Sequence, residues 1–160
     1  MEAIERNDYD IFNMLESDNT QEVQKMGLNM ARDAEDISCF IQPLTPLHNK
    51  GVWENCAKII SARSDEELYP YLDDILEWLQ DLTWPGTFLI IDRLKCFNGE
   101  MLYNAFVKSI YKAESKQYAD YDWLSHLTKL LENAELVKIM DNTLYSKLKK
   151  IYNEFWTGLE

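Results

Sequence analysis

Apolar residues recur along this chain at the spacing of an amphipathic α-helix. In the clearest stretch they stand at positions i, i+3, i+4 and i+7, and are Leu72, Ile75, Leu76 and Leu79. Such residues share one face of a helix, which is buried while the opposite face meets water. Further stripes of this kind start at Val23, Trp53, Leu102, Trp123 and Leu144. No stretch alternates apolar and polar residues as a half-buried strand does, so the pattern predicts an all-α protein.

Cap signals divide this pattern into about nine or ten helices of the usual length. Ser64 and Glu67 have the spacing of a capping box, and Gly99 is placed to end a helix. We expect further helix starts at Thr20, Asn133 and Asn142, and expect a first turn at Pro85 and Gly86. Two prolines interrupt the pattern from Gln42 to Asn49, which predicts an irregular connection there.

The predicted helices fall into antiparallel pairs joined by short loops. One pair comprises residues 72–80 and 85–96, and a second comprises residues 100–113 and 122–132. Equivalent helices of the two pairs are offset by roughly 30 to 37 residues, which is typical of helical repeats. The spacing therefore predicts one domain over residues 1–160, built of stacked antiparallel helix pairs like a HEAT-type α-α superhelix. An irregular bundle is the alternative.

The corner inside the first pair carries the most distinctive residues of the chain. They are Leu76-Glu77-Trp78-Leu79-Gln80-Asp81, followed by Trp84-Pro85. This run resembles the signature of a bacterial domain family of unknown function, DUF5071, with Thr83 where that family usually has asparagine. The resemblance implies a HEAT-like α-helical fold and no established activity. It also implies a small cytoplasmic protein, and some proteins of this kind resemble immunity proteins that neutralise a toxin.

Two roles are open to Trp78 and Trp84, which bracket this corner. Large aromatic side chains usually pack inside a protein, so both tryptophans are expected to lock the corner. The alternative role is that of a surface anchor for a partner protein. Asp81 is in addition placed to accept backbone N–H groups near Thr83.

Charge changes this picture because it is strong and uneven. The 160 residues carry a net charge of −12, and residues 1–80 hold 17 acidic and 6 basic side chains. An acidic surface repels nucleic-acid phosphates, which argues against a nucleic-acid partner. It attracts basic proteins and speeds their association. The alternative role of the charge is to keep the protein soluble.

One predicted helix face concentrates acidic side chains opposite its apolar stripe. Asp73, Glu77, Gln80 and Asp81 stand at i, i+4, i+7 and i+8. Such a face is a solvated surface, a docking face for a basic protein, or a site for a divalent cation or carboxylate catalysis. The residues assigned to binding under the docking hypothesis are Asp73, Asp74, Glu77, Trp78, Gln80, Asp81 and Trp84.

No motif of a known enzyme class appears in the sequence. His48 and His126 are the only histidines, and neither belongs to a metal or nucleophile motif. The three cysteines, Cys39, Cys56 and Cys96, lack zinc-ligand spacing and are expected to be free thiols among apolar neighbours. We therefore expect no metal and no cofactor. An enzyme that uses surface carboxylates or a divalent metal is the alternative hypothesis.

The chain shows no signal for a membrane or for secretion. Its longest purely apolar run is four residues, Phe88 to Ile91, and the first five residues are acidic rather than hydrophobic. The sequence therefore predicts a cytoplasmic, non-enzymatic helical scaffold that binds a basic protein partner. The most specific version of this prediction is an immunity protein that neutralises a basic toxin.

Overall fold

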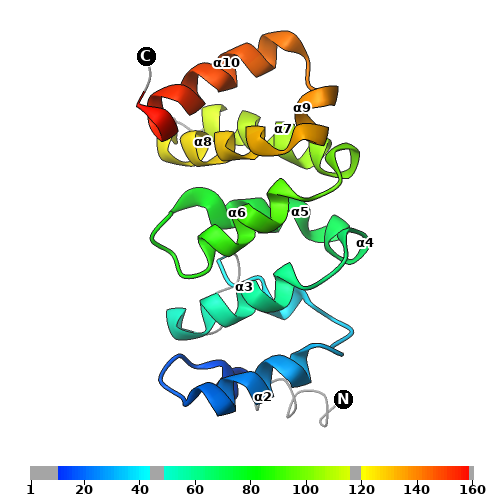
Figure 1. The fold of residues 1–160 in the computed structure, drawn as a ribbon, viewed down its shortest axis with the longest axis vertical. Coiled ribbons are helices and arrows are strands. Elements are labelled where there is room, and N and C mark those ends of the chain that lie inside the picture. Colours follow the sequence, from blue (N-terminus) through cyan, green and yellow to red (C-terminus); the bar gives the residue numbers. More distant parts are fainter. Residues whose placement is uncertain (1–10, 44–48, 116–119, 159–160) are drawn as a thin grey trace.

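The computed structural model describes residues 11–43, 49–115 and 120–158 of the chain. The molecule is an elongated stack of helices in which the first and the last described helices lie at opposite ends of the long axis (Figure 1). All regular elements within the described residues are helical. The all-α prediction is therefore confirmed.

Nine α-helices have both ends inside the described residues, and residues 11–15 are also helical. They are α2 (Gln21–Ala31), α3 (Trp53–Ser61), α4 (Asp65–Leu68), α5 (Leu72–Leu76), α6 (Thr87–Lys95), α7 (Gly99–Ser115), α8 (Tyr121–Leu127), α9 (Ala134–Ile139) and α10 (Asn142–Tyr152). Short 3₁₀ turns connect or extend them: η1 (Ser38–Phe40), η2 (Lys50–Val52), η3 (Tyr69–Tyr71), η4 (Glu77–Gln80) and η5 (Thr128–Glu132). A π-helical turn, η6 (Asn153–Thr157), follows α10.

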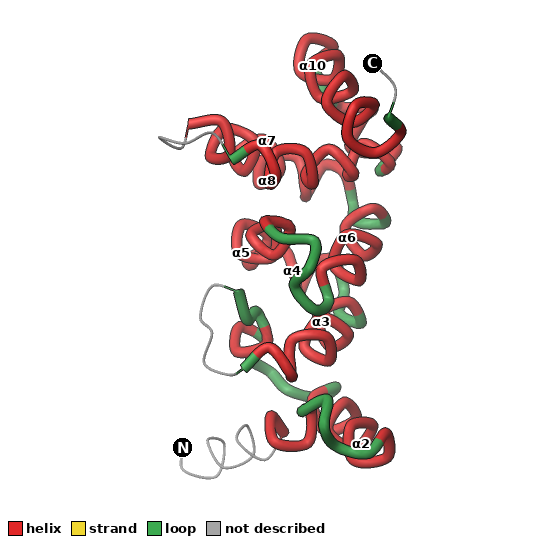
Figure 2. Tube along the Cα trace, turned by 90° about the vertical axis from the view of Figure 1, so that its left-hand side faces the viewer, coloured by secondary structure: helices red, strands yellow, loops and turns green. Residues whose placement is uncertain are grey.

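The helices stack in layers that contact their neighbours along the long axis. On one side of the stack α3 lies between α2 and α6, and α6 packs against η5, which in turn packs against α10 (Figure 2). On the other side α5 packs against α7. The core contains the clearest predicted stripe, since Leu72, Ile75, Leu76 and Leu79 are all at most 2% exposed, whereas Met26 and Met30 of the stripe that starts at Val23 are exposed. Removal of this apolar surface from water is the main stabilising contribution.

Helix caps recur at a regular interval along the stack. Ser64, Asn98 and Asn133 each accept a hydrogen bond from the backbone N–H three residues further on. Their positions, 64, 98 and 133, are 34 and 35 residues apart. This interval is shorter than the about 40–47 residues of a HEAT repeat. Helices packed in successive layers are observed, while the assignment to HEAT-type antiparallel pairs stays a prediction.

Three predicted boundaries are wrong at the level of single residues. Gly99 begins α7 instead of ending a helix, because the Asn98 side chain accepts from the Met101 N–H and so caps the first turn of α7. Asp141, not Asn142, caps α10 by accepting from two backbone N–H groups. Gly86 is predicted to lie in the first turn of a helix. It is instead the N-cap residue of α6, with a φ of 88°, and the helix itself starts at Thr87. The irregular connection predicted from Gln42 to Asn49 lies mostly outside the described residues.

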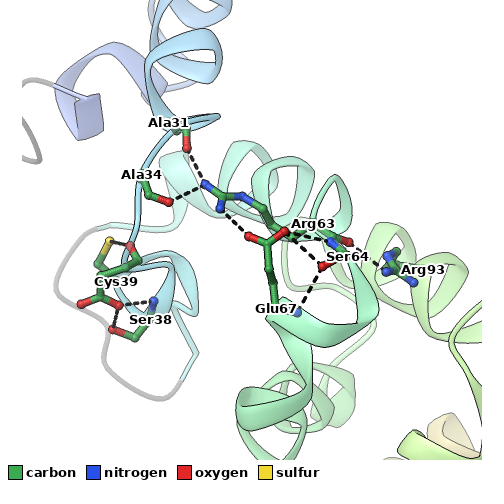
Figure 3. Close-up of polar contacts among 9 residues, drawn as sticks. Ala31, Ala34, Ser38, Cys39, Arg63, Ser64, Glu67 and Arg93 are labelled. Carbon is green, nitrogen blue, oxygen red and sulfur yellow. Dashed lines mark hydrogen bonds and ion pairs between the residues drawn. The ribbon is translucent and has the colours of Figure 1, made fainter.

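Arginines near helix ends join one layer to the next. The Arg63 guanidinium donates to the carbonyl oxygens of Ala31 and Ala34, at 2.9 and 2.8 Å, where α2 ends (Figure 3). The Arg93 guanidinium then donates to the Arg63 carbonyl at 2.8 Å and to the Asp65 carboxylate at 2.6 Å. Carbonyls at helix ends have no partner within their own helix. Each of these arginines lies in the following layer and donates hydrogen bonds to such carbonyl oxygens.

An ionic cluster ties η5 to the last helix, and its effect on stability should depend on pH. Burial opposes ionisation of Glu132, but hydrogen bonds from Lys129, Tyr152 and Lys95 lower its pKa to about 2. The cluster therefore stabilises the fold above the unfolded pKa, about 4.3 for glutamate. Its contribution disappears as the pH falls from there towards 2.

We expect the stability difference between the wild type and Glu132→Gln to be greatest near neutral pH and to shrink progressively below pH ~4.3. Urea unfolding across this pH range measures the difference. Glu154→Gln is the control, because Glu154 is exposed and forms no ion pair with another described residue. A pH-independent difference for Glu132→Gln would contradict the assigned role of the carboxylate.

Candidate interaction surface

The signature run forms a tightly hydrogen-bonded corner between η4 and α6. The Trp78 indole N–H donates to the Pro85 carbonyl at 3.1 Å, and the Thr87 hydroxyl donates to the Asp81 carbonyl at 2.9 Å. The Asp81 carboxylate accepts from the Thr83 hydroxyl and backbone N–H, at 2.7 and 2.8 Å, as predicted. Hydrogen bonds from that hydroxyl and then that N–H lower the pKa of Asp81. Asp81 is thus a turn-forming residue.

Helix α8 holds the same corner from the next layer. The Trp123 indole N–H donates to the Leu76 carbonyl at 3.1 Å. His126 Nδ1 lies 2.5 Å from the Leu79 carbonyl oxygen, which can only accept, so Nδ1 carries the proton. Both carbonyls belong to the region where α5 passes into η4. The buried His126 therefore has a structural partner.

Three indole rings fill the space beneath the corner. Trp53 makes edge-to-face contacts with Trp78 and Trp84, with ring centroids 6.3 and 5.5 Å apart. Trp78 is fully buried, so this residue is not available to a partner and its assignment to the docking face is wrong. Trp84 is half-buried against Trp53. Packing accounts for both tryptophans, in agreement with the first of the two expected roles.

The acidic side chains of α5 and η4 face lysines on α7. Asp73 pairs with Lys108 at 2.9 Å, and Glu77 pairs with Lys112 at 3.4 Å. The Gln80 side chain donates to the Glu77 carboxylate. Both ion pairs join residues 35 positions apart, so α5–η4 and α7 present matching i, i+4 charges to each other. The sequence reasoning missed Lys108 and Lys112.

The structure therefore divides the predicted binding set. Asp73, Glu77 and Gln80 share one polar surface with the α7 lysines, and Asp74 is exposed without an ion pair to any other described residue. Asp81 leaves this face, because η4 is wound more tightly than an α-helix and Asp81 itself is extended, with φ −140° and ψ 116°. The predicted four-residue acidic face is thus wrong at its last member.

The cysteines differ from one another in exposure. Cys56 is buried, and that burial raises the pKa of its thiol, whereas Cys39 is half-buried and Cys96 is exposed. The expectation of apolar surroundings is therefore wrong for Cys96. Across residues 11–43, 49–115 and 120–158, no three His, Cys, Asp or Glu side chains converge as a metal site requires. His48 lies outside these residues.

Two cavities lie between helices, and of their lining residues the sequence assigned only Asp73 to binding. The larger of the two, about 390 Å³, lies between α2 and α3, and its lining contains Arg32, Lys58, Arg63 and Glu67 together with Asn29 and apolar side chains. The smaller, about 190 Å³, lies between η3–α5 and α7. Its lining comes from two segments that are separate in the sequence and that the fold brings together.

In the part of the chain that the structure describes, no helix is long and apolar enough to cross a membrane.

Comparison with known proteins identifies one family. No curated protein and no solved structure matches the chain. The model of a family described as a domain of unknown function, DUF5071, matches residues 49–157. The matched region begins just before α3 and ends with η6. It therefore contains the whole corner together with α3 and α8, the two helices that pack against it. This match covers well over half of the sequence, and the protein therefore belongs to the DUF5071 family.

Proposed function

We propose that this protein is a cytoplasmic, non-enzymatic scaffold that binds a basic protein through its acidic first half. In its most specific form, the proposal is that of an immunity protein that neutralises a basic toxin. A set of exposed acidic side chains in residues 11–80 supports it, because none of them forms an ion pair with another described residue. These unpaired acidic residues are Asp18, Glu22, Asp33, Glu35, Asp36, Glu54, Glu66 and Asp74.

The second half of the chain compensates its own charge to a greater extent. Lys95 and Lys129 pair with Glu132, and Lys147 pairs with Glu114. Acidic side chains of the first half also form ion pairs, but residues 1–80 hold 17 acidic and 6 basic side chains, against 11 and 10 in residues 81–160. The net negative field of the first half steers a positively charged protein towards these layers. All three cysteines are free thiols, as a reducing cytoplasm would keep them.

Charge reversal in the first half should slow association with a basic partner. We expect the triple variant Glu54→Lys, Glu66→Lys and Asp74→Lys to lower the association rate constant about tenfold or more at low salt. The partner is recovered by affinity capture from the source cell, and binding is then followed by stopped flow at several salt concentrations. The variant should also show a weaker dependence of the rate on salt. For the immunity version, the variant should lose protection against the captured toxin.

A second triple variant makes the same change in net charge in the other half. Glu100→Lys, Asp122→Lys and Glu154→Lys also reverse exposed acidic residues in the first turns of their helices. We expect this control to slow association far less than the first variant does. Equal effects of the two variants, or a rate that is insensitive to salt, would reject binding through the acidic half.

A further inference from the structure

The smaller cavity is a groove with the composition of a protein-binding surface. Its walls carry Tyr69, Pro70, Asp73, Met101, Asn104 and Lys108, and buried Leu72 forms part of its lining. Tyr69 is 51% exposed although it is large and apolar. Aromatic side chains and methionine are enriched where proteins meet, whereas lysine and aspartate are depleted there unless they pair. The groove thus combines the side chains of Tyr69, Pro70 and Met101 with one carboxylate, Asp73, and one ammonium, Lys108.

The size of the groove favours a single side chain over a free small molecule. Its volume of about 190 Å³ is below the roughly 300–1,000 Å³ of small-molecule pockets. The larger cavity has a suitable volume for a small molecule, but its three cations, Arg32, Lys58 and Arg63, outnumber its one carboxylate, Glu67, which already pairs with Arg63. Its net positive lining would repel a basic partner. Of these two cavities, only the groove offers a basic side chain both a carboxylate and an exposed aromatic ring.

The carboxylate in the groove is held only loosely by its internal partner. The Lys108 ammonium lies 2.9 Å from Asp73, but the two side chains are 62% and 45% exposed. Exposed pairs of this kind contribute little to stability because water and salt screen them. A guanidinium forms two parallel hydrogen bonds to a carboxylate and stacks on an aromatic ring, whereas an ammonium is a point charge. An arriving arginine is therefore a better ligand for Asp73 than Lys108 is.

We infer that the groove between η3–α5 and α7 receives an arginine side chain of the basic partner, which displaces Lys108 from Asp73 and lies along Tyr69. This inference rests on the proposed function, since it names the contact through which the acidic half recognises its partner. Lys108 then acts as a removable internal substitute for the arginine. The apolar stem of the arginine would cover Pro70 and Met101, as long cationic side chains do on apolar surface.

Short basic peptides test this contact directly. Calorimetry is used to measure binding of hexa-arginine and hexalysine to the full chain, and hexa-arginine should bind several times more tightly. Asp73→Asn should weaken hexa-arginine binding about tenfold, because it removes the charge-assisted bonds. Asp74→Asn is the matched control: it removes the same charge at the next residue, which does not line the groove, and should change binding less than about twofold.

A gain of affinity provides the sharper test. Lys108→Met replaces lysine with another unbranched side chain but removes the ammonium group that competes for Asp73. Hexa-arginine should therefore bind about threefold more tightly. Lys150→Met alters net charge equally on exposed α10 and should have a much smaller effect. Thermal unfolding followed by circular dichroism establishes that each variant is folded.

The outcomes separate the groove from the general proposal. Equal effects of Asp73→Asn and Asp74→Asn, or of Lys108→Met and Lys150→Met, would overturn the groove and leave salt-dependent binding to the acidic half intact. Failure of hexa-arginine to bind the wild type would likewise overturn the groove. Failure of the captured partner to respond to salt or to the triple charge reversal would instead reject the proposed function.

Discussion

Replacing Gly86 with alanine is expected to lower the free energy of unfolding by about 3 kcal/mol, because the change strains the backbone and the core together. Gly86 has a φ of 88°, in the left-handed region that other L-residues rarely adopt. An added Cβ would lie 2.5 Å from the Ala57 Cβ and 3.1 Å from the Trp53 carbonyl oxygen. Neither atom belongs to the far end of a flexible side chain. Urea unfolding followed by circular dichroism measures the loss.

Gly158 provides a control that isolates the backbone contribution. It also has a positive φ, 69°, but an added Cβ would meet nothing within 4 Å. Gly158→Ala should therefore cost only about 1 kcal/mol. The double variant Ala57→Gly and Gly86→Ala should lose less stability than the sum of the two single variants, because it removes the steric contact. Equal losses for the two glycine substitutions would show that the close approach of α6 to α3 is unimportant.

Replacing Asn133 with alanine is expected to cost about 3 kcal/mol, because one buried side chain serves two layers. Its amide nitrogen donates to the carbonyls of Leu94 and Phe97, both at 2.9 Å, where α6 ends. Its amide oxygen accepts from the Leu136 N–H at 3.1 Å and so caps α9. The residue is 2% exposed, so water cannot replace these bonds. Chemical denaturation measures the change.

Two comparisons distinguish the cap from the link between layers. Asp141→Ala removes an exposed N-cap that serves α10 alone, and should cost about 1 kcal/mol. Asn133→Asp keeps an oxygen to cap α9 but places a carboxylate beside two carbonyls, so it should remain strongly destabilising. A loss for Asn133→Ala no greater than that for Asp141→Ala would mean that the bonds to the α6 carbonyls contribute nothing.

The helical fold follows from local information, and for that reason the sequence predicts it well. The stripe through Leu72 and Leu79 and the capping box of Ser64 and Glu67 depend on neighbours within one or two turns. The boundary at Gly99 is wrong because an Asn-Gly pair can end a helix through its glycine or begin one through its asparagine. Contacts from residues distant in sequence favour the second case, because the carboxylates of Asp65 and Glu135 accept from the backbone N–H groups of Asn98 and Gly99.

The surface chemistry depends on contacts that periodicity cannot locate. Asp73 and Glu77 have the pattern of a solvated acidic face, and nothing local to them indicates that α7 lies opposite. One signal was nevertheless present in the sequence. Lys108 and Lys112 repeat the i, i+4 spacing of the two acids at an offset of 35 residues, which equals the interval between the Asn98 and Asn133 caps. Opposite charges at the repeat interval therefore identify facing helices.

The layered arrangement also determines which parts of the molecule should open first. Helix α2 packs against one neighbouring layer, whereas α6 packs against α3 on one side and η5 on the other. Amide hydrogens of α2 should consequently exchange with solvent through local fraying, which costs little free energy. Those of α6 should exchange only when a larger part of the stack opens. The groove between α5 and α7 lies in the middle of the stack, where we expect exchange to be slow. A partner bound in this groove would therefore contact a part of the molecule that stays folded while the outermost helices open locally.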